Sequence, residues 1–272
     1  MRILISVDME GIAGVTGRLE ILPGQQDYDR FRHLMTEEAN AAITGAFAGG
    51  ATSVVVNDSH GQMRNLLYEA LDPRAELISG HNKVLTMVEG CRGAHGALFI
   101  GYHARAGSQA AVLDHTISSV QVHNWFMNGR PVSEAEINAE ILAYYGVPLL
   151  MVSGDDKIAA QVQERLPGVE TVIVKYGIDH RAARSLPRAQ VLDSIQRCAE
   201  KVVRGAQPLA AAPPQPVTFE LEFTRSFYAE VACLMPVVTR IDARTVEVSG
   251  ANIIEAWRWA LSALRLASTG DN

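Results

Sequence analysis

The chain has 272 residues and a formal net charge of −6, with 48% hydrophobic and 20% charged residues. This composition is ordinary for a globular protein, and the length allows one large α/β domain or two smaller ones. The acidic balance and the lack of any Lys/Arg block exclude a typical nucleic-acid-binding surface. No apolar window approaches the length needed to span a bilayer. We therefore expect neither nucleic acid nor a membrane as a partner.

The cysteines and the N-terminus suggest the compartment. Cys91, Cys198 and Cys233 are widely scattered and form no C-x-x-C pair, which is typical of a reducing environment. The first apolar run is only a few residues long and ends in acids, so it does not resemble a signal peptide. We expect a cytoplasmic protein.

Short apolar runs alternate with helical patterns over the first 156 residues. The runs lack the polar alternation of half-exposed strands, as expected for parallel strands covered on both faces. They span residues 3–7, 53–56, 97–100 and 149–152. The helical patterns span residues 28–47, about 81–89, and 134–145. This alternation predicts an α/β fold with a mostly parallel sheet flanked by helices.

The remainder of the chain predicts more of the sheet and then a smaller α/β lobe. The expected elements are a helix at 158–166, a strand at 171–174, a helix at 188–203, strands at 217–223 and 245–248, and a helix at 252–267. The Pro/Ala-rich segment 206–216 is expected to be a stiff connector. The predicted organisation is a metal-binding catalytic domain over 1–205 and a lobe over 217–272, which could belong to the same domain.

Titratable side chains follow each of the four apolar runs. Ligand sites of open α/β sheets lie beyond the carboxyl ends of the strands, so these side chains should share one edge. They are Asp8 and Glu10, Asp58 and His60, His103, and Asp155 and Asp156. Successive side chains on a strand alternate faces, so Asp8 and Glu10 are expected to share one face at the end of the first strand. Two adjacent carboxylates repel unless a positive group lies between them, and a divalent metal is the simplest such group.

A mixed set of carboxylates and imidazoles is the candidate metal site: Asp8, Glu10, His60, His103 and Glu134. Oxygen and nitrogen ligands without thiolate suit Zn, Mn or Co. Five ligands exceed what one catalytic zinc needs, whereas two ions bridged by Asp8 would use all five. Each residue also has an ordinary alternative, because Asp8 could cap a turn, His60 could lie in a loop, and Glu134 could be an exposed first-turn acid.

Two further residues have open roles. A histidine near metals, such as His115, can transfer protons or hold a substrate group, although solvated or core histidines are more common. Asp156 precedes a helix and is expected to be its N-cap, whereas Asp155 could line the crevice and pair with a substrate ammonium group. Gly11, Gly14 and Gly17 match neither phosphate-binding glycine pattern, which argues against a nucleotide site.

Seven segments in order resemble the D-aminopeptidases of the dipeptide-transport type, a family of binuclear zinc peptidases. The segments are SVDMEGIAG (6–14), MTEEAN (35–40), VNDSHG (56–61), LISG (77–80), MVEG (87–90), GYHARA (101–106) and SGDD (153–156). The resemblance thins after about Leu209. It implies two zinc ions on the five candidate ligands, and a homo-oligomer of stacked rings forming a decamer. His115 corresponds to the proposed catalytic residue of the family, although its surroundings differ here (LDHT, 113–116).

The expected function is therefore a metal-dependent aminopeptidase that releases an N-terminal residue, D-Ala for example, from short peptides or amino-acid amides. A binuclear metallophosphohydrolase is the second interpretation, since two-metal sites also cleave phosphate esters. A third is a non-catalytic binding protein stabilised by structural metals, whose sites are closed.

Overall fold

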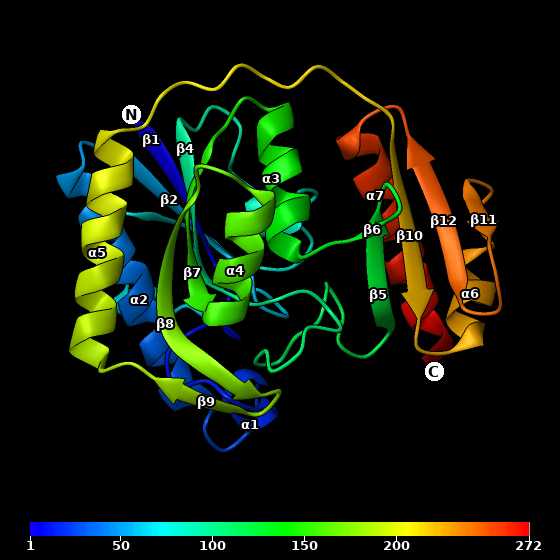
Figure 1. The fold of residues 1–272 in the computed structure, drawn as a ribbon, viewed down its shortest axis with the longest axis horizontal. Coiled ribbons are helices and arrows are strands. Elements are labelled where there is room, and N and C mark those ends of the chain that lie inside the picture. The colour runs from blue at the N-terminus through cyan, green and yellow to red at the C-terminus, as the bar shows by residue number, and fades with distance from the viewer. Residues whose placement is uncertain (272) are drawn as a thin grey trace.

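Two β-sheets organise the protein, whose computed structural model describes residues 1–271 (Figure 1). The strands of sheet A are β1 (Arg2–Val7), β2 (Ser53–Asp58), β3 (Glu76–Ile78), β4 (Gly96–Tyr102), β7 (Leu149–Asp155), β8 (Glu170–Asp179) and β9 (Ala182–Ser185). Their spatial order is β3-β2-β1-β4-β7-β8-β9, with parallel pairing throughout except between β8 and β9. The predicted mostly parallel sheet is confirmed.

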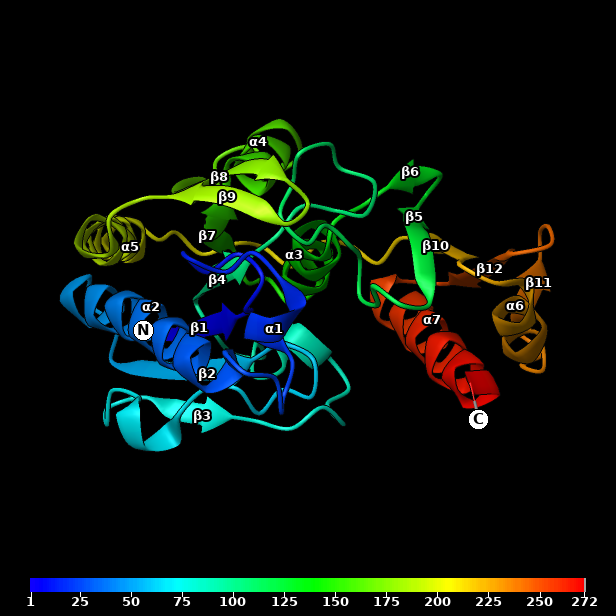
Figure 2. The same cartoon turned by 90° about the horizontal axis from the view of Figure 1, so that it is seen from below.

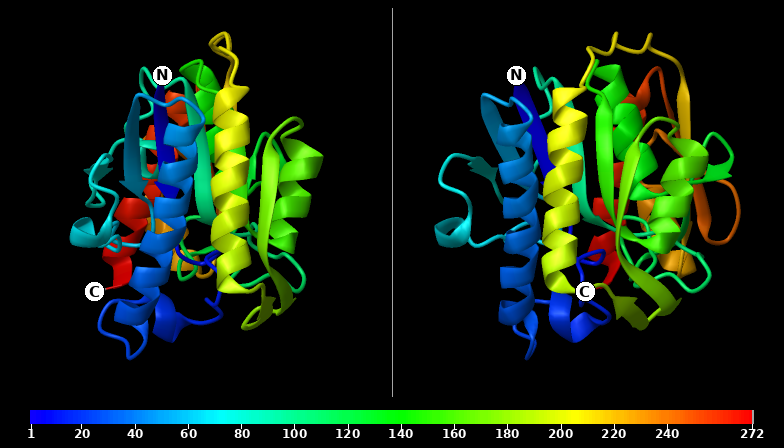
Figure 3. Two further views of the ribbon diagram at one scale, coloured as in Figure 1. Left: turned by 90° about the vertical axis from the view of Figure 1, so that its left-hand side faces the viewer. Right: turned by 60° about the vertical axis from the view of Figure 1, so that its left-hand side comes forward.

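Helices cover both faces of sheet A. One face carries α2 (Tyr28–Ala48) and α5 (Arg188–Arg204), and the other carries α3 (Glu134–Tyr144) and α4 (Asp156–Arg165) (Figures 1 and 3). These are the four helices that the apolar periodicity predicts outside segment 81–89 and the C-terminal lobe. The α2 and α5 backbones approach closely at Gly45, where an added Cβ would lie 2.2 Å from the Gln196 carbonyl oxygen.

The prediction of a helix at about 81–89 is wrong. Its only helical piece is the 3₁₀ turn Thr86–Val88. The Asn57 side-chain amide donates to the carbonyls of Thr86 and Met87, at 3.0 and 2.7 Å, and the Lys83 amine donates to Asn57 Oδ1 at 2.7 Å. Asn57, at the end of β2, thus bonds two carbonyls that a helix would have used internally and a lysine side chain that a helix would have exposed.

Sheet B forms the smaller lobe together with two helices. Its strands are β5 (Val122–Met127), β6 (Arg130–Pro131), β10 (Val217–Phe223), β11 (Val238–Arg240) and β12 (Thr245–Gly250), and its helices are α6 (Ser226–Ala232) and α7 (Ile253–Ala267). The strand order is β11-β12-β10-β5-β6. The strands predicted at 217–223 and 245–248 and the helix at 252–267 are confirmed, whereas β5 and β6 come from a part of the chain that precedes the connector.

The lobe lies on the α3 side of sheet A, where α7 packs against α3 (Figure 2). Residues 206–216 connect α5 to β10 without regular structure and are mostly exposed, as the yellow arch in Figure 1 shows. Within residues 1–271, no helix has both the length and the apolarity to cross a membrane.

Candidate metal centre

The strand order explains why distant residues meet. Strand β1 lies between β2 and β4, so Asp8 at its end stands between His60, two residues past β2, and His103, directly after β4. Glu134 is the first residue of α3. Side chains that follow neighbouring parallel strands share one edge of the sheet. All five candidate ligands are buried there, with at most 6% of any residue exposed.

Glu10 reaches the cluster by a route that the sequence did not predict. Strand β1 ends at Val7, and the Ile12 N–H donates to the Met9 carbonyl at 3.2 Å, closing a turn. The expectation that strand alternation aligns Asp8 with Glu10 is therefore wrong. The turn brings the Glu10 carboxylate to the His60 ring.

His60 points one ring nitrogen, Nδ1, at two carboxylates. Its Nε2 donates to the Ile21 carbonyl at 2.8 Å, which leaves the lone pair of the neutral ring on Nδ1. Nδ1 lies 2.9 Å from Glu10 Oε2 and 3.3 Å from Asp8 Oδ1. Burial opposes the charged ring, but the negative charges of Glu10 and Asp8 raise the pKa of His60 well above its usual range. The two buried carboxylates therefore require a cation beside Nδ1, either a proton on the ring or a metal ion.

His103 repeats this geometry on the other side of Asp8. Its Nδ1 donates to the Ala104 carbonyl at 3.0 Å, while the fully buried Nε2 has no hydrogen-bond partner. That nitrogen lies 3.4 Å from Asp8 Oδ2 and 3.5 Å from Glu134 Oε1. An orphaned nitrogen costs free energy in a buried site unless a ligand engages it, so His103 has the environment of a metal ligand.

Helix capping fixes Glu134 at the cluster. Ser133 caps α3 and forms a reciprocal capping box with Glu136. Glu134 itself is 4% exposed, and its Oε1 accepts the Ile117 N–H at 2.7 Å. Glu134 therefore differs from the exposed first-turn acid that the sequence left as an alternative.

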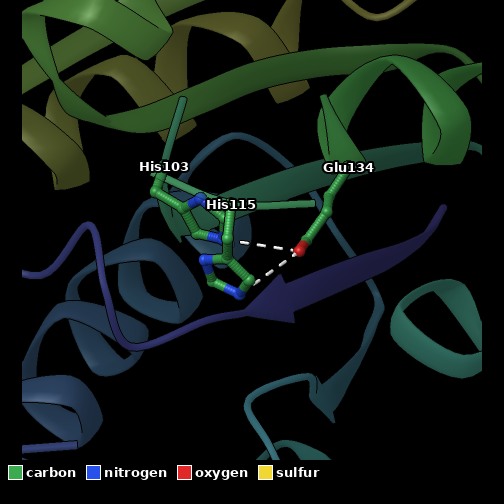
Figure 4. A group of neighbouring side chains, drawn as sticks. All are labelled: His103, His115 and Glu134. Atoms are coloured by element: carbon green, nitrogen blue, oxygen red, sulfur yellow. Dashed lines mark ion pairs between the residues drawn. The ribbon is translucent and has the colours of Figure 1, made fainter. Parts of the chain in front are cut away.

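His115 lies beside His103 and approaches the Glu134 carboxylate (Figure 4). Its ring stacks on that of His103, with centroids 4.1 Å apart and 7° between the planes. Nδ1 donates to the Leu113 carbonyl at 2.9 Å, and Nε2 lies 3.7 Å from Glu134 Oε1 and 4.0 Å from Glu10 Oε1. The side chain is 15% exposed, more than any candidate ligand.

The donor atoms fit zinc. Two ligands on one tetrahedral zinc lie about 3.3 Å apart, and the His60–Asp8 and His103–Asp8 distances, 3.3 and 3.4 Å, match this spacing. The two Asp8 oxygens face different histidines. Two groups of three residues bring their donor atoms close together. One group is Asp8, Glu10 and His103, and the other is His103, His115 and Glu134. In each group, one donor atom of every residue lies within 4.8 Å of those of the other two.

A cavity of about 890 Å³ opens onto the cluster. The cluster side contributes Asp8, Glu10, His60, His115 and Glu134 to its wall, and the lobe contributes Trp257 and Leu261 from α7. Arginines 18, 181 and 265 also line it. The wall of the cavity thus contains both the carboxylates of the cluster and arginine side chains.

Asp155 does not line this cavity. It caps α4, with Oδ1 accepting the N–H groups of Lys157 and Ile158 at 3.0 and 2.9 Å, so the N-cap expected at Asp156 is displaced by one residue. Its Oδ2 accepts the Val112 N–H at 3.0 Å. Backbone groups therefore occupy both oxygens, and the geometry does not favour the predicted contact with a substrate ammonium group.

A further residue, not predicted from the sequence, is Lys175, whose buried ammonium donates to the carbonyl of Glu10. The available signal was a lysine directly after the apolar residues 172–174 of a strand. A charge in a strand covered on both faces needs internal partners.

Comparisons with known proteins identify the family of the chain. The chain is 40% identical over 272 residues to a D-aminopeptidase of Bacillus subtilis (strain 168), covering 98% of each chain. Its structure resembles that of the Zn-dependent D-aminopeptidase DppA from Bacillus subtilis, described as a self-compartmentalizing protease, with a TM-score of 0.93, 38% identity and 98% coverage of each chain. A family model described as D-aminopeptidase matches residues 1–262, and the chain therefore belongs to the D-aminopeptidase family.

Proposed function

We propose that this enzyme removes an N-terminal D-amino acid, such as D-Ala, from short peptides or amino-acid amides with two zinc ions per subunit, Mn or Co being substitutes. The observation that carries the metal assignment is the buried, unpartnered Nε2 of His103 between Asp8 and Glu134. The similar Bacillus enzyme is Zn-dependent.

The donor geometry supports a division of ligands. His60 faces one oxygen of Asp8 and also Glu10, whereas His103 faces the other oxygen of Asp8 and also Glu134. Asp8 is then the bridging carboxylate. Zinc bound here would supply a Lewis acid for the scissile carbonyl and a water of lowered pKa.

The proposed catalytic residue is His115. Its Nε2 faces the cavity side of the cluster, where it can give a proton to the leaving amine. The Leu113 carbonyl accepts from Nδ1 and fixes the ring orientation. Glu10 Oε1 and Glu134 Oε1 flank Nε2, at 4.0 and 3.7 Å.

The cavity supports a small peptide as the substrate. Its volume of about 890 Å³ lies in the usual range for small-ligand sites. Arg18, Arg181 and Arg265 in the wall suit the free carboxylate of a short peptide.

Assembly and location extend the proposal. Since the Bacillus enzyme is described as self-compartmentalizing, we propose that this chain also forms a homo-oligomer, and the family resemblance suggests a decamer in the cytoplasm. Light scattering of the purified protein measures the number of subunits.

The decisive test is metal analysis of the purified protein together with Asp8→Ala. We expect a metal-to-chain ratio near two, lost on substitution of the bridging ligand, and hydrolysis of D-Ala-D-Ala that chelation abolishes and zinc restores. Asp193→Ala, which removes a half-exposed acid of α5, is the matched control and should keep both properties.

The other interpretations predict different outcomes. A phosphohydrolase would release phosphate from model esters without cleaving amides. A protein with structural metals would bind zinc and cleave neither. Either result, or D-Ala-D-Ala hydrolysis that survives thorough chelation, would contradict the proposal.

A further inference from the structure

Lys175 is a buried lysine whose partners are all backbone carbonyls. It lies on β8 with 0% of its surface exposed. Its Nζ donates to the carbonyls of Glu10 at 2.5 Å, Ile12 at 2.9 Å and Val15 at 2.7 Å. An ammonium group has three N–H donors, so these bonds use all of them. Among the ion pairs of residues 1–271, none involves Lys175.

All three carbonyls belong to the loop that follows β1, residues 10–15. The loop also fixes its N–H groups, because Gly11 donates to the Gly101 carbonyl at 2.8 Å and Ala13 to Glu38 Oε1 at 2.8 Å. Gly11 lies so close to β4 that an added Cβ would come within 2.0 Å of the Tyr102 carbonyl oxygen. The end of β4 thus contacts one part of the loop while Lys175 holds its carbonyls.

The consequence concerns Glu10, whose carbonyl accepts from Lys175 while its carboxylate lies 2.9 Å from His60 Nδ1. The direction of a side chain depends on the conformation of its own backbone. Three hydrogen bonds from one rigidly placed ammonium restrict that backbone at three positions. An apolar residue of the same size has no N–H group to donate. With such a residue at position 175, the three carbonyls would lose a buried hydrogen-bond partner.

We propose that Lys175 is a positioning residue for the metal centre, which orients Glu10 by holding the carbonyls of the loop over residues 10–15. The inference rests on the proposed function, because it assumes that the cluster binds zinc. Lys175 contacts neither a donor atom nor the cavity; it acts through the loop backbone. Groups that orient metal ligands from behind commonly change metal affinity by about 10–100-fold when they are removed.

The test is zinc affinity, measured by competition with a chromogenic chelator. Lys175→Met keeps the length and apolar stem of the side chain but removes all three donors, and we expect zinc to bind about 10–100-fold more weakly. The visible absorption of the Co²⁺-loaded variant should also differ from that of the unsubstituted protein, since the ligand geometry changes. Both measurements are independent of turnover.

Val246→Ala is the matched control. Val246 is fully buried on β12 in sheet B, so this substitution creates a core defect away from the cluster. It should lower the melting temperature but leave zinc affinity and the Co²⁺ spectrum unchanged. Loss of affinity in Lys175→Met that exceeds the control then reports positioning and not general destabilisation.

Each outcome is decisive. Unsubstituted protein that binds no zinc would contradict the proposed function itself. If it binds zinc and Lys175→Met binds equally well with the same Co²⁺ spectrum, the positioning role is overturned. Should Lys175→Met fail to fold, Lys175→Gln, which keeps two N–H donors, replaces it: weaker zinc binding supports the role, and unchanged binding refutes it.

Discussion

Among the ionisable residues of the cluster, His115 combines access to the cavity with a position beside the buried ligands. Its side chain is 15% exposed, whereas that of His103, on which it stacks, is 1% exposed. A proton-transfer group must reach solvent or substrate, while a metal ligand is better buried. The two stacked histidines are thereby suited to different tasks.

Replacing His115 by Asn should separate these tasks. We expect kcat for D-Ala-D-Ala to fall by about 10²–10⁴-fold, the usual contribution of a general acid or base, with zinc content unchanged. Steady-state kinetics and metal analysis measure the two effects. His180→Asn, which alters another histidine of the cavity wall, is the control. A loss of zinc in His115→Asn would instead identify His115 as a ligand.

Glu38 gives the stability of the protein a specific pH dependence. Burial raises its pKa to about 7 from the ordinary value of 4.5, and its Oε2 has no hydrogen-bond partner. Between these two pH values the folded state holds a proton that the unfolded state has lost. The contribution of Glu38 to the free energy of unfolding is therefore fully present below about pH 4.5 and is lost as the pH rises through about 7.

Glu38→Gln should remove this dependence. The neutral amide avoids the cost of a buried carboxylate, so at pH 8 the variant should be more stable than the unsubstituted protein, by up to roughly 3 kcal/mol. At pH 5 the difference should be small. Urea unfolding of metal-free protein at both pH values measures it, with Glu69→Gln at an exposed position as the control. Equal differences in the free energy of unfolding at pH 5 and pH 8 would contradict the raised pKa of Glu38.

At the scale of elements, the sheet could be predicted, and so could the meeting of Asp8, His60 and His103 at one of its edges, because both depend on local pattern and strand order. Short apolar runs specify buried parallel strands, and the residues after them share one edge. Glu134 was harder to judge, because only tertiary packing decides whether a first-turn acid is buried.

Other elements depend on contacts between distant residues. The helical pattern at 81–89 does not form a helix because Asn57, on β2, takes the carbonyls of Thr86 and Met87. Strand β5 gains its pairing from β10, which begins 90 residues after the last residue of β5. Lys175 is stabilised by carbonyls about 160 residues earlier. Local periodicity contains no information about such partners.

Asp155 joins two elements, because it caps α4 and holds the loop that leads to His115 through the Val112 N–H. Asp155→Ala should lose the cap and leave a buried N–H unsatisfied, at a combined cost of about 2–4 kcal/mol. We expect kcat to fall with little change in KM, as the His115 loop loosens. Urea unfolding and kinetics test this. A variant of unchanged stability with a raised KM would support the original prediction of a substrate contact.

At the scale of the whole molecule, the body (residues 1–205) and the C-terminal segment (residues 206–272) depend on each other. The body contributes β5 and β6 to sheet B, and α7 of the C-terminal segment contributes Trp257 and Leu261 to the wall of the cavity that opens onto the metal centre. Trp125 on β5 packs against Phe219 and Trp257 of the C-terminal segment, with ring centroids 5.8 and 5.9 Å apart. One hydrophobic cluster contains residues of both parts.

A chain ending at residue 205 tests whether the body is an independent domain. It would lack β10, leaving an edge of β5 unpaired, and would expose Trp125, which is 1% exposed in the whole protein. Loss of packing around a buried Trp costs about 3–5 kcal/mol, a large share of a typical domain's stability. We therefore expect aggregation, or a state without near-UV circular dichroism, and rescue on co-expression with residues 206–272. A truncated chain that remains monomeric, with a cooperative unfolding transition, would show instead that 1–205 folds as a domain of its own.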